Sequence, residues 1–254
     1  MNVKIPSEIT AIAKKLRDKK YHAFLVGGCV RDFLLNKKPK DWDVATNAKP
    51  EEIQKIFPDS VYENRFGTVA IKTDSEDQTL KIIEATSFRL EGKYTDKRHP
   101  DEIKFAKTIE EDLARRDFTV NAMAAEIQFE ENIKIVDPFD GQKDLKNKII
   151  RTVGEPSKRF NEDALRLMRA VRFSAELNFE IEEKTAAAIK EEAHLLAVIA
   201  KERICDELEK IIITERAAEG VQKLKKLNLL PHIIPELGEG IGVGQNKHHI
   251  YDVY

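Results

Sequence analysis

The chain has 254 residues, of which 41% are hydrophobic and 35% charged, and its formal net charge at pH 7 is -2. This length exceeds one typical domain, so we expect two or more compact units. No stretch approaches the roughly 20 apolar residues that span a bilayer, and the opening MNVKIPSEI lacks the apolar core of a signal peptide. Cys29 and Cys205, the only cysteines, form neither a disulfide framework nor a metal cluster. We therefore expect a cytoplasmic protein without a membrane segment, on which a local basic stripe could still bind nucleic acid.

Helix and strand signals alternate through the first part of the chain. Apolar residues at helical spacing predict a helix over residues 7–19, and short apolar runs predict strands at 23–26 and 42–45. The other elements predicted here are a helix at 50–57, strands at 61–72 and 80–87 with a polar turn at 74–78, and a charged loop at 89–100.

Helical periodicity dominates from about residue 157, and strand signals vanish there. We expect a domain boundary between residues 152 and 156. The pattern therefore predicts an α/β head followed by an all-helical portion. The helices predicted in that portion span residues 161–177, 182–193, 201–213 and 217–227.

A pair of glycines, Gly27 and Gly28, stands between the predicted strand at 23–26 and a helical run at 30–35. Because glycine lacks a Cβ atom, the backbone can approach a phosphate closely. The strand-turn-helix order would also place backbone amides at a helix N-terminus, which favours anions. The pair is consistent with a phosphate-binding turn, but a glycine pair alone more often marks an ordinary turn.

Two aspartates, Asp41 and Asp43, follow the glycine pair and flank Trp42. Residues at i and i+2 of a strand point to the same face, so both carboxylates would project together while Trp42 and Val44 turn the other way. Two such oxygen ligands can hold Mg²⁺ against the phosphates of a nucleotide. The alternative is a solvated acidic strand. The combination of this motif with the glycine turn favours a metal and triphosphate site.

The segment EEDLARRDFTVNAMA, at residues 110–124, places cationic, acidic and amide groups close together. Arg115 and Arg116 are followed by Asp117 and, four positions later, by Asn121. An arginine can fork onto phosphate oxygens, and a carboxylate can accept a hydrogen bond from a ribose hydroxyl. The spacing alone equally allows an ion-paired surface helix.

The sequence NEDALRLMRAVRFSAEL predicts a helix that begins at Asn161, a good N-cap residue with acidic residues behind it. Arg166, Arg169 and Arg172 recur every three residues along one side of this helix. Asp163 lies one turn ahead of them. A carboxylate so placed can accept from an exocyclic amine of a base, while arginines donate to ring acceptors or bind phosphates. A solvated basic face is the alternative interpretation.

The glycine pair with its Asp-x-Asp motif resembles the signature of the DNA polymerase β-like nucleotidyltransferase superfamily. With RRDFTVNA, the DPFDG turn at 137–141, and the EDALR helix that continues through RAVRF, it resembles the class II branch, the bacterial-type tRNA nucleotidyltransferase and poly(A) polymerase family. The resemblance extends over residues 23–237. It implies an α+β head with a mixed sheet at 1–155, an all-α neck that recognises the base at 156–216, and the start of an all-α body at 217–254. The nucleotide would lie between head and neck.

The resemblance also implies roles for particular side chains, by matching position. Asp41 and Asp43 correspond to the catalytic Mg²⁺ ligands, and Glu84 stands where a third carboxylate is expected. Asp163 and Arg166 resemble an amino-acid template that pairs with the incoming base. The residues implied in nucleotide binding are Gly28 and Arg31 at the triphosphate, Arg116 in the nucleotide site, Asp117 at the ribose, Asp163 and Arg166 at the base, and Arg169 and Arg172 beside them.

Members of this branch differ in the nucleotides that they add. Residues 62–69 resemble the tRNA nucleotidyltransferase form, since poly(A) polymerases carry an arginine-rich strand there. The full loop at 89–100 resembles enzymes that add the terminal A, whereas enzymes that add only two cytidines have a shortened loop. The resemblance thus implies addition of CCA to the tRNA 3′ end from CTP and ATP, with pyrophosphate released. An A-adding enzyme, a poly(A) polymerase and a non-catalytic RNA-binding module stay open as alternatives.

The C-terminal HHIYDV, at residues 248–253, resembles the opening of a metal-dependent HD phosphohydrolase domain. The later His and Asp ligands of such a site do not follow, so we expect no hydrolase activity. We expect the chain to be a fragment of a longer polypeptide. The sequence does not specify an oligomeric state.

Overall fold

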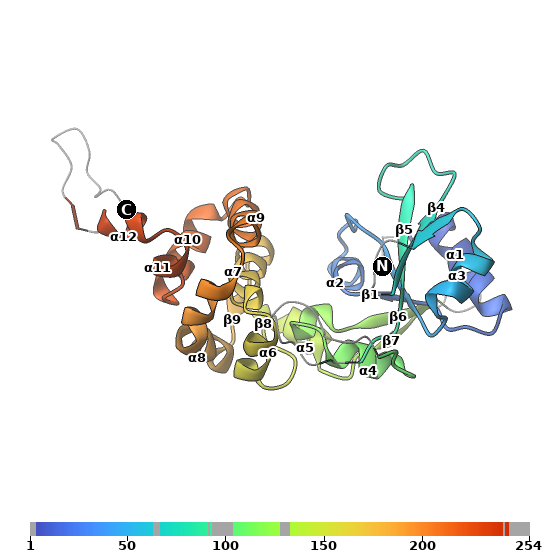
Figure 1. The fold of residues 1–254 in the computed structure, drawn as a ribbon, viewed down its shortest axis with the longest axis horizontal. Helices are drawn as coiled ribbons and strands as arrows, with labels where there is room; N and C mark the ends of the chain where they lie inside the picture. The colour runs from blue at the N-terminus through green and yellow to red at the C-terminus, as the bar shows by residue number, and fades with distance from the viewer. Residues whose placement is uncertain are drawn as a thin grey trace. The chain divides into compact units, whose positions relative to one another are not determined.

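The computed structural model describes residues 4–62, 67–90, 92, 104–127, 133–240 and 242–243. The described residues fall into two compact units, one up to Asn147 and one from Lys148 onward. We call them the head unit and the helical unit. Figure 1 draws their elements in chain order, from blue to red.

The head unit is built on a seven-stranded sheet in the order β3-β4-β5-β2-β1-β6-β7. β2 and β5 pair in parallel, and every other neighbouring pair is antiparallel. The sheet is therefore mixed, and the predicted α+β head is confirmed. The strands are β1 (Phe24–Val26), β2 (Asp43–Thr46), β3 (Ser60–Tyr62), β4 (Thr68–Lys72), β5 (Ile82–Ser87), β6 (Ala124–Ile127) and β7 (Ile133–Val136).

Helices pack onto this sheet through apolar faces. α1 (Ser7–Asp18) buries four side chains that recur at i, i+3, i+4 and i+7, namely Ile9, Ile12, Ala13 and Leu16. α3 (Pro50–Ile56) begins with a proline, whose fixed φ suits a first helical turn, and contacts both α1 and β4 (Figure 1). The other head helices are α2 (Gly28–Leu34), α4 (Ile109–Ala114), the 3₁₀ turn η1 (Thr119–Asn121) and α5 (Gly141–Asn147).

An apolar cluster joins α4 to the strands in the middle of the sheet. Phe24 and Val26 of β1 pack with Phe88, and α4 contributes Ile109 and Leu113. Burial of such side chains stabilises the fold by roughly 1.5 to 3 kcal/mol each. This cluster holds the end of α4, and the arginines that follow it, against the strand that leads into the glycine turn.

The helical unit is organised around α7 (Leu165–Leu177), which packs against α9 (Lys201–Ile212) and α10 (Ala217–Lys226). Asn178 ends α7 in the left-handed conformation, with φ 58°, which asparagine tolerates better than most residues. The predicted all-α portion is thus confirmed in its main elements. The remaining helices are α6 (Pro156–Glu162), α8 (Glu183–Glu192), the 3₁₀ segment η3 (Ala193–Val198), α11 (Leu230–Ile233) and α12 (Pro235–Glu239).

The helical unit also contains a small two-stranded sheet. β8 (Ile149–Ile150) and β9 (Glu180–Ile181) pair in parallel, one before and one after α7 in the sequence. The prediction that strands vanish beyond residue 157 is wrong at β9. A strand of two residues is too short to show alternation in the sequence.

The predicted helix start at Asn161 is also wrong. Asn161 lies inside α6, where its side-chain Nδ2 donates to the Ser157 carbonyl at 3.0 Å. α6 ends at Glu162, Asp163 is extended with φ -143° and ψ 104°, and α7 begins at Leu165. Asp163 Oδ1 accepts the Leu165 N–H at 3.1 Å and so takes the capping role. The pattern missed α6 because Pro156 was placed outside any helix, whereas it occupies the first turn, where proline is tolerated.

Some predicted segments lie wholly or partly outside the described residues. The structure describes only residues 89, 90 and 92 of the loop at 89–100, and residues 62 and 67–69 of the segment at 62–69. The HHIYDV segment at 248–253 also lies outside. The domain limits at 155 and 216 and the cytoplasmic location stay predictions. In the part of the chain that the structure describes, no helix has the length and hydrophobicity to cross a membrane.

Candidate functional site

The glycine turn connects β1 to α2 and requires glycine on two counts. Gly27 has φ 73° and ψ -133°, a backbone state that side chains disfavour. A Cβ atom added there would lie 2.9 Å from Arg116 Nη1. The guanidinium of Arg116 therefore lies directly over the backbone of the turn, although the two residues are far apart in the sequence.

Arg31, on α2, lies beside the second glycine of the turn. A Cβ atom added to Gly28 would be 3.7 Å from Arg31 Nη2. The side chain is 8% exposed. Its Nε donates to Asp32 Oδ1 at 2.8 Å, and its Nη1 donates to Asn121 Oδ1 at 2.9 Å. The turn is thus flanked by two guanidiniums held by neighbouring side chains, an arrangement that attracts an anion.

Asn121, which the sequence assigned no role of its own in the site, connects Arg31 to Asp117. Its Oδ1 accepts from Arg31, and its Nδ2 donates to Asp117 Oδ1 at 3.4 Å. The Phe118 N–H donates to the same Asp117 oxygen at 2.8 Å. These bonds fix the orientation of the buried Asp117 carboxylate. The spacing of Asp117 and Asn121 at i and i+4 was the signal that could have revealed the link.

Asp43 is the first residue of β2, and Asp41 lies two residues before it, outside the strand. Asp41 is exposed and Asp43 half-buried, while Trp42 and Val44 are buried, so burial alternates along the segment. Burial raises the pKa of Asp43, the nearby Arg116 guanidinium opposes that shift, and the charge of Asp41 adds to it. The two aspartates are therefore close enough to repel each other.

Glu84 of β5 is the register partner of Asp43 in the parallel β2–β5 pair. It is exposed. Within the described residues, no group of three or more His, Cys, Asp and Glu side chains is gathered as a metal cluster. Asp41 and Asp43 offer carboxylate oxygens, the kind of ligand that Mg²⁺ takes in proteins.

Cys29, next to the glycine turn, is unsuited to chemistry. Its Sγ donates to the Val26 carbonyl at 3.1 Å, and burial raises the pKa of the thiol to about 12. The thiol stays protonated at neutral pH.

In the helical unit, Asp163 lies in the break between α6 and α7, and Arg166 is the second residue of α7. Both Asp163 carboxylate oxygens accept from Arg203 Nη2 of α9, at 3.2 and 3.3 Å. Arg166 Nη1 donates to Glu162 Oε2 at 2.7 Å and to the Arg159 carbonyl at 3.1 Å. The proposed template residues are thus oriented by partners, and the long-range partner Arg203 could not be found from local spacing.

Arg169 and Arg172 lie half-buried along α7 and share a contact with Phe173. The guanidinium carbons lie 5.2 and 4.3 Å from the centre of the Phe173 ring. Arg172 Nε also lies 2.8 Å from Glu207 Oε2 of α9. The predicted stripe of arginines on α7 therefore exists, but its members pack against acidic and aromatic side chains, which does not fit a simple solvated basic face.

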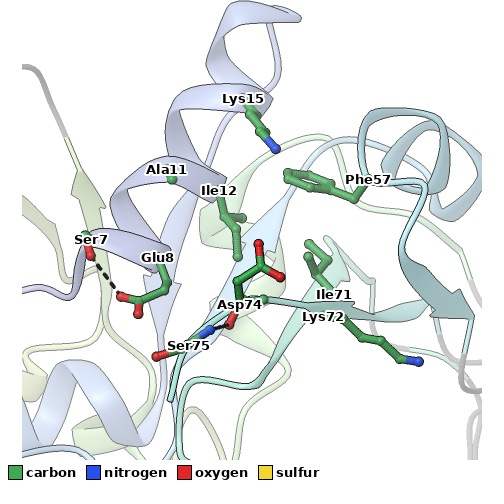
Figure 2. Close-up of a pocket in the computed structure, with 11 residues that line it drawn as sticks. Ser7, Glu8, Ala11, Ile12, Lys15, Phe57, Ile71, Lys72, Asp74 and Ser75 are labelled. Carbon is green, nitrogen blue, oxygen red and sulfur yellow. Dashed lines mark hydrogen bonds between the residues drawn. The ribbon is translucent and has the colours of Figure 1, made fainter. Parts of the chain in front are cut away.

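The predicted residues fall into two sets. Asp41, Asp43, Gly28, Arg31, Arg116 and Asp117 belong to the head unit, and Asp163, Arg166, Arg169 and Arg172 to the helical unit. A separate pocket of about 420 Å³ in the head unit contains none of them. Figure 2 shows this pocket between α1, Phe57 and the end of β4, with Lys15 pointing toward the Phe57 ring.

Comparison with known proteins identifies the family. Residues 23–151, half of the chain, match the family model "Poly A polymerase head domain". The chain belongs to this family. The resemblance drawn from the motifs is thereby confirmed. Residues 178–240 of this member of the poly(A) polymerase head family match a second model, "Probable RNA and SrmB- binding site of polymerase A".

Several relatives of this poly(A) polymerase head family member are named CCA-adding enzymes. That of Pediococcus pentosaceus is 46% identical over 221 residues, which cover 86% of this chain and 54% of the relative. The structure of the Bacillus stearothermophilus CCA-adding enzyme in complex with CTP is 39% identical, with a TM-score of 0.79 over 90% of this chain and 54% of that one. The structure of the Thermotoga maritima CCA-adding enzyme complexed with tRNA is 25% identical, with a TM-score of 0.76 over 92% of this chain and 54% of that one. The chain spans about half the length of the curated relatives that it matches.

Proposed function

We propose that this protein adds CCA to the 3′ end of tRNA without a nucleic-acid template, using CTP and ATP and releasing pyrophosphate. The observation that carries the proposal is the glycine turn with Arg31 and Arg116 beside it, in the same unit as Asp41 and Asp43. Two guanidiniums over a backbone without Cβ atoms suit a triphosphate, and two adjacent carboxylates suit the cation that accompanies it. Relatives named CCA-adding enzymes support the choice of reaction.

Asp41 and Asp43 are the residues that would hold Mg²⁺. The crowding of the two negative charges, which contributes to the raised pKa of Asp43, is relieved when a cation binds between them, so the donor set fits the ion. When bound, Mg²⁺ would neutralise charge on the phosphates and on the attacking and leaving oxygens. Glu84, the register partner of Asp43, stands where a third carboxylate could contribute.

The head residues position the triphosphate and the sugar. Arg31 and Arg116 donate to phosphate oxygens at the glycine turn. Because Gly28 has no side chain, the phosphate can approach the backbone closely there. Asp117, oriented by Phe118 and Asn121, accepts from a ribose hydroxyl. Because phosphoryl transfer asks little covalent chemistry of the protein, positioning and charge neutralisation supply the catalysis. The tRNA 3′-hydroxyl then attacks the α-phosphorus in line, and pyrophosphate leaves toward the arginines.

The helical unit supplies the choice of base. Asp163 accepts from an exocyclic amine, and Arg166 donates to a ring acceptor of the incoming C or A. Arg203 and Glu162 hold these two side chains in the free protein. Arg169 and Arg172 complete the nucleotide-binding side of α7.

Labelled nucleotide incorporation tests the proposal. The protein is incubated with Mg²⁺ and labelled CTP or ATP, together with tRNAs that end before CCA, after C, or after CC. We expect C on the first two and A on the third. Addition of A alone to the CC-ending tRNA would indicate an A-adding enzyme, and long A tails a poly(A) polymerase. Binding of tRNA with no incorporation, unchanged in Asp43→Asn, would contradict the proposal and leave an RNA-binding module.

A further inference from the structure

A buried carboxylate, Asp112, bonds to the arginine that lies over the glycine turn and has no role of its own in the proposed reaction. It belongs to α4 and is 1% exposed. Oδ1 accepts from Arg115 Nε and Nη2, at 3.0 and 2.6 Å, and from the Arg89 N–H at 3.1 Å. Oδ2 accepts from Arg116 Nη2 at 3.1 Å. Asp112 thus binds two guanidiniums and the backbone of the segment that follows β5.

An ionised carboxylate at such a position is costly unless its partners compensate. Burial alone would raise the pKa of Asp112, but the charges of Arg115 and Arg116 and the hydrogen bonds from Arg115 and Arg89 outweigh it and lower the pKa. Asp112 is therefore a fixed negative charge at neutral pH. A fixed charge can orient a mobile cation that faces it.

Arg116 has more than one acidic neighbour. Its Nη2 bonds to Asp112, its Nη1 lies over Gly27, and its charge is also felt by Asp43. Without Asp112, the guanidinium would still be attracted by Asp43, one of the two carboxylates offered to a metal, because the charges of Arg116 and Asp43 already interact. An Arg116–Asp43 pair would remove both a phosphate donor and a metal ligand.

We propose that Asp112 is a positioning residue that holds the Arg116 guanidinium over the glycine turn, ready for a triphosphate, and keeps it from pairing with Asp43. The proposal rests on the function proposed above. Asp112 reaches neither nucleotide nor metal itself. It acts through Arg116, and its effect is specific to ligands that carry phosphates.

The test compares Asp112→Asn with Asp144→Asn. Asp144 is also a 1% exposed carboxylate of the head unit, but it accepts from the Thr119 hydroxyl at 2.7 Å. Binding of CTP, ATP and inorganic triphosphate is titrated at a temperature at which each variant is folded by circular dichroism. We expect Asp112→Asn to weaken all three by roughly tenfold, the worth of a charge-assisted hydrogen bond, and to raise KM more than it lowers kcat. Asp144→Asn should change binding by less than about twofold.

A second background separates positioning from general structural damage. In Arg116→Ala, the further change Asp112→Asn should cost less than about twofold, because the group that it positions is gone. An equal loss in both backgrounds, or wild-type affinity in Asp112→Asn, would overturn the proposal. If Asp112→Asn does not fold, Asp112→Glu, which keeps the charge, is compared with Arg116→Ala; affinity no better than that of Arg116→Ala would also overturn it. Failure of the wild type to bind any triphosphate would instead refute the proposed function.

Discussion

The head unit and the helical unit both carry arginines near their proposed sites, but they arrange them differently. In the head, Arg31 and Arg116 come from distant parts of the sequence and converge on one glycine turn. In the helical unit, Arg166 and Arg172 come from one helix, and each lies within 3 Å of its own carboxylate, Glu162 or Glu207. Arg31 and Arg116 are also paired, with Asp32 and Asp112. The two units therefore differ in convergence: the head brings two guanidiniums to one turn, whereas the helical unit spaces its paired arginines along one helix.

This difference matches two kinds of recognition. A triphosphate is recognised mainly by charge, so donors gathered over a bare backbone suit it. A base is recognised by the direction of its donors and acceptors, so side chains held in place by partners suit it. The contrast predicts that changes in the head affect all nucleotides alike and that changes beside Asp163 affect them unequally.

The largest expected effect on activity comes from substituting the two carboxylates of the head, Asp41 and Asp43. Asp43→Asn or Asp41→Asn should lower nucleotide incorporation by roughly a thousandfold or more, because each removes a ligand from an electrostatic clamp that acts on the reacting phosphate. Both variants should fold normally. The matched control is Asp59→Asn, an exposed aspartate of the same unit, which should retain wild-type incorporation. Undiminished activity in Asp43→Asn would contradict the assignment of Asp43 as a metal ligand.

Two glycine substitutions contrast the units directly. Gly27→Ala strains a residue at φ 73° and pushes on Arg116, so triphosphate affinity should fall by roughly tenfold. Gly220→Ala places a Cβ atom 2.5 Å from Ile211 Cγ2 in the core of the helical unit. It should lower the free energy of unfolding by about 1 to 3 kcal/mol and leave triphosphate affinity unchanged. Urea unfolding and nucleotide titration on both variants test these expectations. Loss of triphosphate affinity in Gly220→Ala but not in Gly27→Ala would contradict the contrast between the units.

Asp112 gives the head a pH-dependent contribution to stability. Its pKa in the folded chain lies below that of the unfolded chain, so the carboxylate stabilises the fold above the unfolded-state pKa, and the contribution is lost as pH falls through the folded-state pKa. Asp112→Asn should therefore lower the free energy of unfolding by about 1 to 3 kcal/mol at neutral pH. The difference in free energy of unfolding between Asp112→Asn and the wild type should become smaller below about pH 4. Urea unfolding of both proteins at neutral pH and below about pH 4 measures this difference. A difference that does not change with pH would mean that the charge of Asp112 plays no part.

A smaller effect is expected at Arg203, which holds Asp163 from α9. Arg203→Ala should loosen the Asp163 carboxylate and reduce the preference for CTP and ATP over UTP and GTP by several-fold, about 1 kcal/mol. Lys201, exposed on the same helix, provides the control Lys201→Ala, for which selectivity should not change. Loss of stability without loss of selectivity would limit Arg203 to a structural role.

The sequence predicted those parts of the site that depend on local pattern. The strand before Gly27, the alternation of Asp41 and Asp43 with buried Trp42, and the change to helices after the head all follow from spacing within a few residues. It could not place Arg116 over Gly27, Asp112 against Arg89, or Arg203 against Asp163, because these contacts join segments far apart in the chain. The helix break at Asp163 was missed for a local reason. Asn161 and Asp163 are both residue types that cap helices, so the sequence does not show which of them begins α7.

The most direct test of the division between the units compares Arg116→Ala with Arg166→Ala. kcat/KM is measured for CTP, ATP, UTP and GTP on tRNA substrates that accept C or A. Arg116→Ala should lower all four by a similar factor, because it removes a phosphate donor. Arg166→Ala should lower CTP and ATP selectively and reduce the preference for them over UTP and GTP by about 10- to 150-fold, equivalent to 1 to 3 kcal/mol. A uniform drop across the four nucleotides in Arg166→Ala would contradict the assignment of base choice to the helical unit.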